Sequence, residues 1–303
     1  MTARVHVLGL DRPVLGMGLM LGFCVLAPMG DAIGKMLAEN HAVMQIVLCR
    51  FAVQAAVLIP LVRATGRSFA MSSLGWRLTV LRTVLHVNGL WMMITALTYL
   101  PLADAIAIAF VMPFILLLLG HFLLGETVGR RRLTACAVGF GGTLMVMQPS
   151  FAAVGWPALY PLGVAVSFAG FMLVTRRIAG EADPLAMQGM SGTMATVGLC
   201  LLYLILPSEG IFALTSISSD WTLWLVMGLL GTGAHLLMTW SLRFAEASTL
   251  APMQYLEIPI AAIIGLIAFG DWPNGLALAG IGVTIGTGLY ILWRENADGR
   301  ARA

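Results

Sequence analysis

The chain has 303 residues, of which 59% are hydrophobic and 10% are charged, and its mean hydropathy is +0.93. Soluble domains carry about 25% charged residues, so this chain cannot cover a globular surface with polar groups, and its apolar content also excludes disorder. The net charge of +3, with no run of basic residues that forms a binding stripe, gives no basis for nucleic-acid binding. The composition predicts an integral membrane protein.

Apolar stretches of membrane-spanning length follow one another along the chain. A transmembrane helix needs about 20 mostly apolar residues. The expected spans are Val14–Leu37, Ala42–Val62, Trp76–Tyr99, Ala105–Gly125, two within Leu133–Thr175, Pro184–Ser208, Trp221–Leu242, Leu250–Gly270 and Trp272–Trp293. The turn-forming cluster from Gln148 to Pro157 divides the longest stretch. The sequence therefore predicts an all-α membrane protein with ten transmembrane helices, because a β-barrel would show alternation instead of continuous apolar runs.

The basic residues predict the orientation of these helices. With the N-terminus in the cytoplasm, all but three of the 17 Lys and Arg residues lie in cytoplasmic segments, as the positive-inside rule requires. The exceptions, Lys35, Arg50 and Arg82, lie within predicted helices. We therefore expect both termini to be cytoplasmic.

The two halves of the chain resemble each other. When one half is laid on the other, Pro113 coincides with Pro259, and Gly125–Glu126 coincides with Gly270–Asp271. We therefore divide the chain into residues 1–150 and 151–303, each with five predicted helices. Because five is odd, the second half must enter the membrane from the opposite side. Inverted repeats of this kind are typical of alternating-access transporters, which hold the substrate between the halves.

These features resemble the EamA unit of the drug/metabolite transporter superfamily. The matching residues are Ala96–Leu97, Tyr99–Leu100, Asp104–Ala105, Pro113, Gly125–Glu126, Gly139, Gly141 and Gly142 in the first half, and Gln254–Pro259, Gly270–Asp271, Gly280, Gly282 and Gly286 in the second. The resemblance implies two inverted five-helix units in the bacterial inner membrane, and transport of amino acids, other metabolites, nucleosides or drugs. Asp271 replaces the glutamate that the family more usually has.

Glu257 is the strongest candidate for a functional side chain. It lies inside a predicted span, where a charge costs about 2.5–3.5 kcal/mol on insertion scales. We expect Gln254 one turn earlier on the same helix face, with Tyr255 nearby. The carboxylate either binds a substrate cation or a coupling proton, or it pairs with an arginine and has only a structural role.

Two arginines inside predicted spans are candidate ligands for an anionic substrate group. Arg82 and His86 have the spacing of one helical turn, with Asn88 and Trp91 further along, and Arg50 lies in the preceding span. Arginine can bind a carboxylate or a phosphate through two parallel hydrogen bonds. Alternatively, Arg50 pairs within the protein, and Arg82 extends toward the cytoplasmic membrane surface.

Other polar residues in the predicted spans have two possible roles each. Asp31, Lys35 and Glu39 follow at intervals of four residues, which predicts a charge ladder along one helix. The ladder is either a solvated helix end or an external gate that includes Asp31 and Lys35. His235 is a lone histidine in an apolar helix, with either a structural role or a place in the substrate site.

Two other function classes compete with a transporter. Gly189–Gly192 has the Gly-x-Ser-Gly pattern of intramembrane serine proteases, with Ser191 as nucleophile and His235 as its partner, although such small residues usually allow close helix packing. A channel would need a charged ring or a filter sequence, and neither is present.

The candidate residues favour a secondary transporter. The sequence contains no ATPase, metal-binding or cofactor motif, so we expect no metal and no cofactor. An acidic residue together with arginines favours an amino-acid-like or other mixed-charge metabolite, and leaves proton coupling open.

Overall fold

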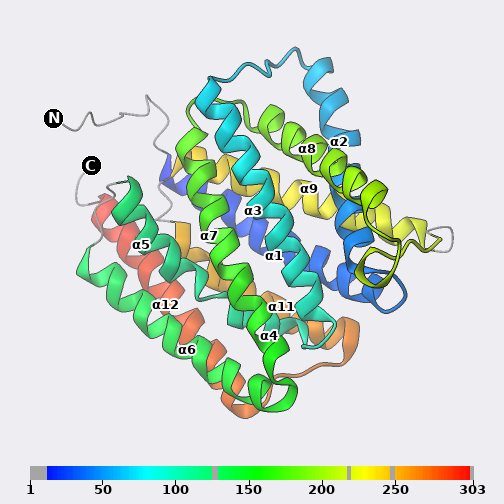
Figure 1. Ribbon diagram of the computed structural model, residues 1–303. Helices are drawn as coiled ribbons and strands as arrows, with labels where there is room; N and C mark the ends of the chain where they lie inside the picture. The colour runs from blue at the N-terminus through cyan, green and yellow to red at the C-terminus, as the bar shows by residue number, and fades with distance from the viewer. Residues whose placement is uncertain (1–11, 125–128, 217–219, 246–249, 301–303) are drawn as a thin grey trace.

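The computed structural model describes residues 12–124, 129–216, 220–245 and 250–300 (Figure 1). Within these ranges the chain forms helices and no strands. The α-helices are α1 (Pro13–Ala38), α2 (Val43–Ala64), α3 (Ser73–Leu97), α4 (Leu102–Ala109), α5 (Met112–Leu124), α6 (Arg130–Val154), α7 (Tyr160–Ile178), α8 (Pro184–Ile205), α9 (Trp221–Phe244), α11 (Glu257–Phe269) and α12 (Gly275–Arg300). The short 3-10 helices are η1 (Trp156–Leu159), η2 (Gly210–Phe212) and η3 (Ala251–Leu256).

The prediction of an all-α multi-pass membrane protein is confirmed. Seven helical stretches are long and apolar enough to cross a membrane, namely Pro13–Ala38, Val43–Ala64, Ser73–Leu97, Leu102–Leu123, Trp156–Ile178, Pro184–Ile205 and Trp221–Phe244. Three shorter apolar helices, Leu133–Met145, Met253–Phe269 and Gly275–Thr287, lie in the other predicted spans. The total of ten membrane crossings stays a prediction.

Two predicted spans are interrupted instead of continuous. The first is divided between α4 and α5, and the second begins as the 3-10 helix η3 before it continues as α11. Proline explains both interruptions. Pro113 has no N–H to bond the carbonyl of Ala109, where α4 ends, and Pro259 has none for the carbonyl of Tyr255, inside η3. The helix breaks therefore fall at corresponding places in the two halves.

The turn between the fifth and sixth predicted spans begins later than predicted. The cluster that begins at Gln148 was expected to form a turn, but α6 continues to Val154. The helix ends at Gly155, whose φ of 68° suits a residue without a side chain.

Helices of the first half pack against helices of the second. The main pairs are α1 with α9, α3 with α7, α2 with α8, α6 with α12, and α4 with α11. In Figure 1, α6 and α12 lie side by side, and α2 lies beside α8. If the halves are exchanged in helix order, the α1–α9 pair becomes the α7–α3 pair, and the α4–α11 pair becomes the η3–α5 pair, whose members are also in contact. The other two pairs map onto themselves.

Candidate functional site

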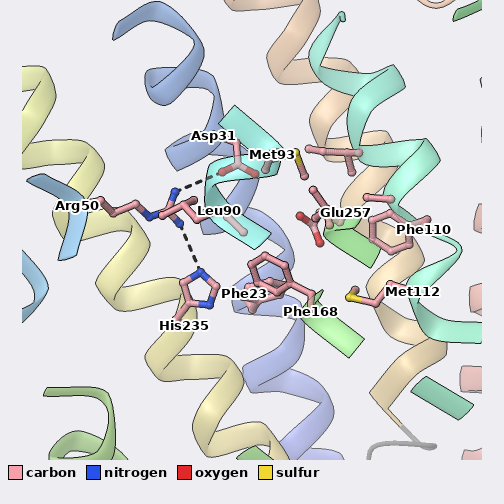
Figure 2. Close-up of a pocket in the computed structure, with 14 residues that line it drawn as sticks. Phe23, Asp31, Arg50, Leu90, Met93, Phe110, Met112, Phe168, His235 and Glu257 are labelled. Atoms are coloured by element: carbon pink, nitrogen blue, oxygen red, sulfur yellow. Dashed lines mark hydrogen bonds and ion pairs between the residues drawn. The ribbon is translucent and has the colours of Figure 1, made fainter. Parts of the chain in front are cut away.

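A cavity lies between helices from both halves of the chain, and it contains about 510 Å³ of space free of protein atoms (Figure 2). The cavity reaches both helix breaks. Phe110 and Met112 line it where α4 gives way to α5, and Glu257 lines it where η3 gives way to α11. Interrupted helices leave backbone polar groups free, and such segments are tolerated at membrane depth where they line a cavity.

On one side of the cavity, Arg50 is held by two partners. Its Nη1 donates to Asp31 Oδ1 at 3.3 Å, and its Nη2 lies 3.4 Å from His235 Nε2. The three side chains come from α2, α1 and α9 and are all buried. The guanidinium fits against α9 because Gly231 has no side chain there. The Asp31–Arg50 pair is therefore compensated within the protein.

Glu257 faces the same cavity from the other side (Figure 2). Its side chain is buried, and its carboxylate has no hydrogen bond or ion pair within the part of the chain that the structure describes. As the first residue of α11, it lies at a helix N-terminus, where the helix dipole stabilises negative charge. The predicted alternative of an arginine partner for Glu257 is wrong, since Arg50 pairs with Asp31 and Arg82 bonds elsewhere.

The remaining wall of the cavity is apolar, and half of its residues are phenylalanine or methionine. Phe23, Phe110 and Phe168 line it together with Met93 and Met112. Aromatic faces and polarisable thioethers pack well against flat organic rings, and methionine adapts to irregular shapes. The cavity therefore combines charged groups with a surface for an aromatic or apolar moiety.

Arg82 lies outside this cavity, in a polar cluster of its own. Its Nε donates to Thr175 Oγ1 at 2.8 Å, its Nη1 donates to Ser191 Oγ at 2.6 Å, and its Nη2 donates to Gln188 Oε1 and Thr239 Oγ1. These partners lie on α7, α8 and α9, and all are neutral. Arg82 is 0% exposed, so the predicted extension to the membrane surface is wrong.

His86 lies among rings between the two arginines. Its ring centroid is 4.2 Å from that of His235, 4.6 Å from Phe171, 4.9 Å from Phe51 and 5.8 Å from Phe168. Neither ring nitrogen of His86 has a hydrogen-bond partner within the described residues, and neither does Nδ1 of His235. A buried polar group without a partner costs about 1–3 kcal/mol.

The other predicted site residues lie outside the cavity wall. Asn88 donates to Ser167 Oγ at 2.8 Å, and the indole of Trp91 packs edge-on against a tyrosine ring. Gln254 donates to the sulfur of a methionine at 3.1 Å, and the ring of Tyr255 lies 5.5 Å from that of Phe110. Gln254 and Tyr255 belong to the 3-10 helix η3, which leads directly into α11 at Glu257. The place of Gln254 and Tyr255 in a substrate site stays a prediction.

The predicted charge ladder on α1 is not formed. Asp31 bonds Arg50, whereas Lys35 Nζ lies 3.1 Å from Asp271 Oδ2 and donates to the Leu100 carbonyl at 3.3 Å. Lys35 also lies 4.5 Å from the centroid of the Phe269 ring. Asp31 and Lys35, the two residues of the proposed gate, therefore have separate partners. Asp31 belongs to the cavity, and Lys35 joins the first half to the turn that follows α11.

Comparison with known proteins identifies the family. The sequence matches the EamA-like transporter family over residues 14–148 and again over residues 155–293. The chain belongs to this family. It is 28% identical to a riboflavin transporter of Rhizobium johnstonii, over 78% of this chain and 76% of that protein. It is 25% identical to an S-adenosylmethionine uptake transporter of Rickettsia prowazekii, over 90% of each chain. A crystal structure with 17% identity aligns with a TM-score of 0.68, over 91% of this chain and 94% of the other.

Membership in the EamA-like family decides between the competing classes. The family and its relatives are transporters of small molecules, so the protease alternative is wrong. The geometry agrees, because Ser191 accepts a hydrogen bond from Arg82 and the Nε2 atom of His235 faces Arg50. The chain is a multi-pass membrane transporter.

Proposed function

We propose that this EamA-like protein is a secondary transporter that moves a small mixed-charge organic metabolite across the bacterial inner membrane by alternating access. The substrate would lie in the central cavity, with its cationic group at Glu257, its anionic group toward Arg50, and its apolar or aromatic part against the phenylalanines. Residues 1–150 and 151–303 would be inverted repeats of five membrane-spanning helices, with both termini in the cytoplasm.

The architecture supports alternating access. Both matches to the family cover one half of the chain each, and the main helix pairs are preserved when the halves are exchanged. The helix breaks before Pro113 and Pro259 both border the cavity. In transporters built from inverted repeats, the substrate site lies between the repeats and is formed by discontinuous helices.

The unpaired carboxylate of Glu257 is the observation on which the substrate class depends. A buried charge needs a partner of opposite sign, and the described residues supply none to Glu257, whereas Asp31 already has Arg50. An ammonium or sulfonium group of the substrate would supply it. Arginine has five N–H groups, and the contacts of Arg50 with Asp31 and His235 use only two of them. The others remain for a substrate carboxylate.

The relatives favour an aromatic solute of this kind. S-adenosylmethionine, named for the relative from Rickettsia prowazekii, carries a sulfonium, an amino-acid group and a purine ring. Riboflavin, named for the relative from Rhizobium johnstonii, is aromatic but has no cationic group. Because no described residue pairs with Glu257, the charge pattern of the cavity favours the first type.

Uptake into proteoliposomes tests the proposal. Purified protein would be supplied with labelled S-adenosylmethionine, phenylalanine and riboflavin, without ATP and at two pH values. We expect saturable uptake of at least one mixed-charge solute above that of protein-free liposomes, and slower uptake of riboflavin. Uptake of riboflavin alone, or of none of the three, would contradict the proposed substrate class. An imposed proton gradient that drives uptake would show proton coupling, and loss of that dependence in Glu257→Gln would place the proton at Glu257.

Thiol labelling in cells tests the orientation separately. In a cysteine-free background, Ser208→Cys follows α8 and Ser68→Cys follows α2, and both positions are exposed. We expect an impermeant external reagent to modify the cysteine at 208 and to leave the one at 68 unmodified until the membrane is opened. The reverse pattern would refute the cytoplasmic position of the termini.

A further inference from the structure

We propose that His86 and His235 form a second substrate subsite, next to the cavity, that binds the carboxylate or another hydrogen-bond-accepting group of the solute. This inference rests on the proposed function, because it names the part of the substrate that a specific pair of side chains would recognise. The two rings come from α3 in the first half and α9 in the second.

The contact with Arg50 fixes the tautomer of His235. Arginine donates hydrogen bonds and never accepts them, so Nε2 of His235 must be the acceptor in its 3.4 Å contact with Nη2 of Arg50. The proton of a neutral imidazole then lies on Nδ1. This N–H group is buried and has no acceptor within the described residues. In Figure 2 this second nitrogen is turned away from Arg50.

His86 adds a further donor beside it. Its ring is 1% exposed, lies 4.2 Å from the His235 ring, and has no partner at either nitrogen within the part of the chain that is described. A neutral imidazole always carries one N–H group. Two imidazole rings from opposite halves of the protein therefore lie side by side, each with an N–H group that no described residue accepts from.

The surrounding charges favour an acceptor over a cation. Arg82 lies 4.4 Å from the Phe171 ring, and the same ring lies 4.6 Å from His86. The guanidinium of Arg82 has only neutral hydrogen-bond partners, so its positive charge is not compensated by an ion pair in the described structure. A substrate ammonium would be repelled here, whereas a carboxylate would gain both hydrogen bonds and attraction.

Phe168 packs against both histidines at the wall of the cavity, which His235 itself lines and His86 does not. Phe168 lines the cavity, stacks on the His235 ring at 5.7 Å, and contacts the His86 ring edge-on at 5.8 Å. Its ring lies directly on the backbone of α3 at Gly89, where a Cβ atom would be only 2.7 Å from the ring. A rotation of Phe168 would open His86 to the cavity that His235 already lines, so the complete subsite would be occupied in a state of the transport cycle other than this one.

Nitrogen NMR of the full-length protein in nanodiscs tests the subsite. With ¹⁵N-labelled histidine, the ring signals would be titrated with phenylalanine and, separately, with phenethylamine, which has the same ring and ammonium but no carboxylate. We expect phenylalanine to shift the His86 and His235 signals and phenethylamine to leave them in place. His41, which is hydrogen-bonded to Thr215 and Asp220, is the internal control. Absent shifts, or equal shifts with both solutes, would overturn the subsite.

A variant distinguishes recognition from packing. His86→Phe keeps an aromatic ring but removes both nitrogens, and should weaken phenylalanine binding about tenfold while phenethylamine binding stays unchanged, since one hydrogen bond to a charged group is worth about this factor. Unchanged phenylalanine affinity would show that His86 only packs. Failure of the proposed function would look different, because wild-type protein would then take up no mixed-charge solute, whatever the histidine signals do.

Discussion

Adding one methyl group at Gly231 should displace Arg50 from its place in the cavity wall. A Cβ atom at this position would lie 2.8 Å from Cζ and 3.0 Å from Nη2 of Arg50, and would also approach Nε. Ordinary contact begins near 3.4 Å, so the guanidinium has to move. Its contacts with Asp31 and His235 already measure 3.3 and 3.4 Å, and a shift away from α9 lengthens at least one of them beyond hydrogen-bonding range.

The expected cost follows from these contacts. Hydrogen bonds to charged groups are worth about 1.5–3 kcal/mol each, whereas alanine in place of glycine gains up to about 1 kcal/mol in a helix. Gly233 lies two residues further along α9, and the nearest atom to a Cβ there is a leucine methyl at 3.6 Å. Gly233→Ala should therefore show only the stabilisation that alanine gives to a helix. Gly231→Ala should be less stable than this control by about 2–3 kcal/mol.

Thermal unfolding in detergent, together with uptake in proteoliposomes, would measure the difference. A loss of that size corresponds to a melting temperature lower by roughly 5–10 °C. We also expect Gly231→Ala to lose most of its transport, because Arg50 would no longer face the cavity in the same position. If the two alanine variants melt together and transport equally, Arg50 is not held against α9 and the description of this side of the cavity is wrong.

Three further predictions concern contacts away from or beside the cavity. Lys35→Met and Asp271→Asn should each lower the free energy of unfolding by about 0.5–1 kcal/mol, as for other partly exposed ion pairs. A double variant in which Asp replaces Lys35 and Lys replaces Asp271 should recover most of that loss. Gly142→Ala should separate α6 from α12, because its Cβ would lie 2.8 Å from a backbone oxygen of α12, whereas Gly141→Ala meets nothing within 4 Å and should melt like wild type. Asp31→Asn leaves its guanidinium partner buried without a counter-ion, and should destabilise the protein by about 3–5 kcal/mol. Equal melting of the glycine variants, or a stable Asp31→Asn protein, would contradict the corresponding contact.

The sequence predicts the helices well because their signal is local. Continuous apolar runs indicate membrane-spanning helices wherever they occur, and the family resemblance rests on short motifs. The helix breaks could be predicted from the sequence only in part. Pro113 and Pro259 were visible as matching positions, and the missing N–H of each removes a bond four residues earlier, but only the structure places Phe110 and Glu257 at these breaks in one cavity.

Pairing between distant residues could not be predicted. The spacing of Asp31 and Lys35 favoured an ion pair within α1. In the structure Asp31 pairs with Arg50 instead, and Lys35 pairs with Asp271, which lies 236 residues away in the chain. Buried ions select the partner that packing brings closest, and sequence spacing does not encode that choice. Arg82 shows the same limit, since four neutral acceptors from the second half satisfy it.

Transport by a Glu257→Gln protein tests the central claim most directly. Because Glu257 has no cationic partner among the described residues, glutamine strands no buried charge, and the variant should insert, purify as a single species and melt like wild type. Its uptake of mixed-charge solutes should collapse, since the amide cannot bind a cation as the carboxylate does. Normal uptake of such solutes by the folded variant at every pH would contradict the account, because Glu257 would then have no part in binding the substrate.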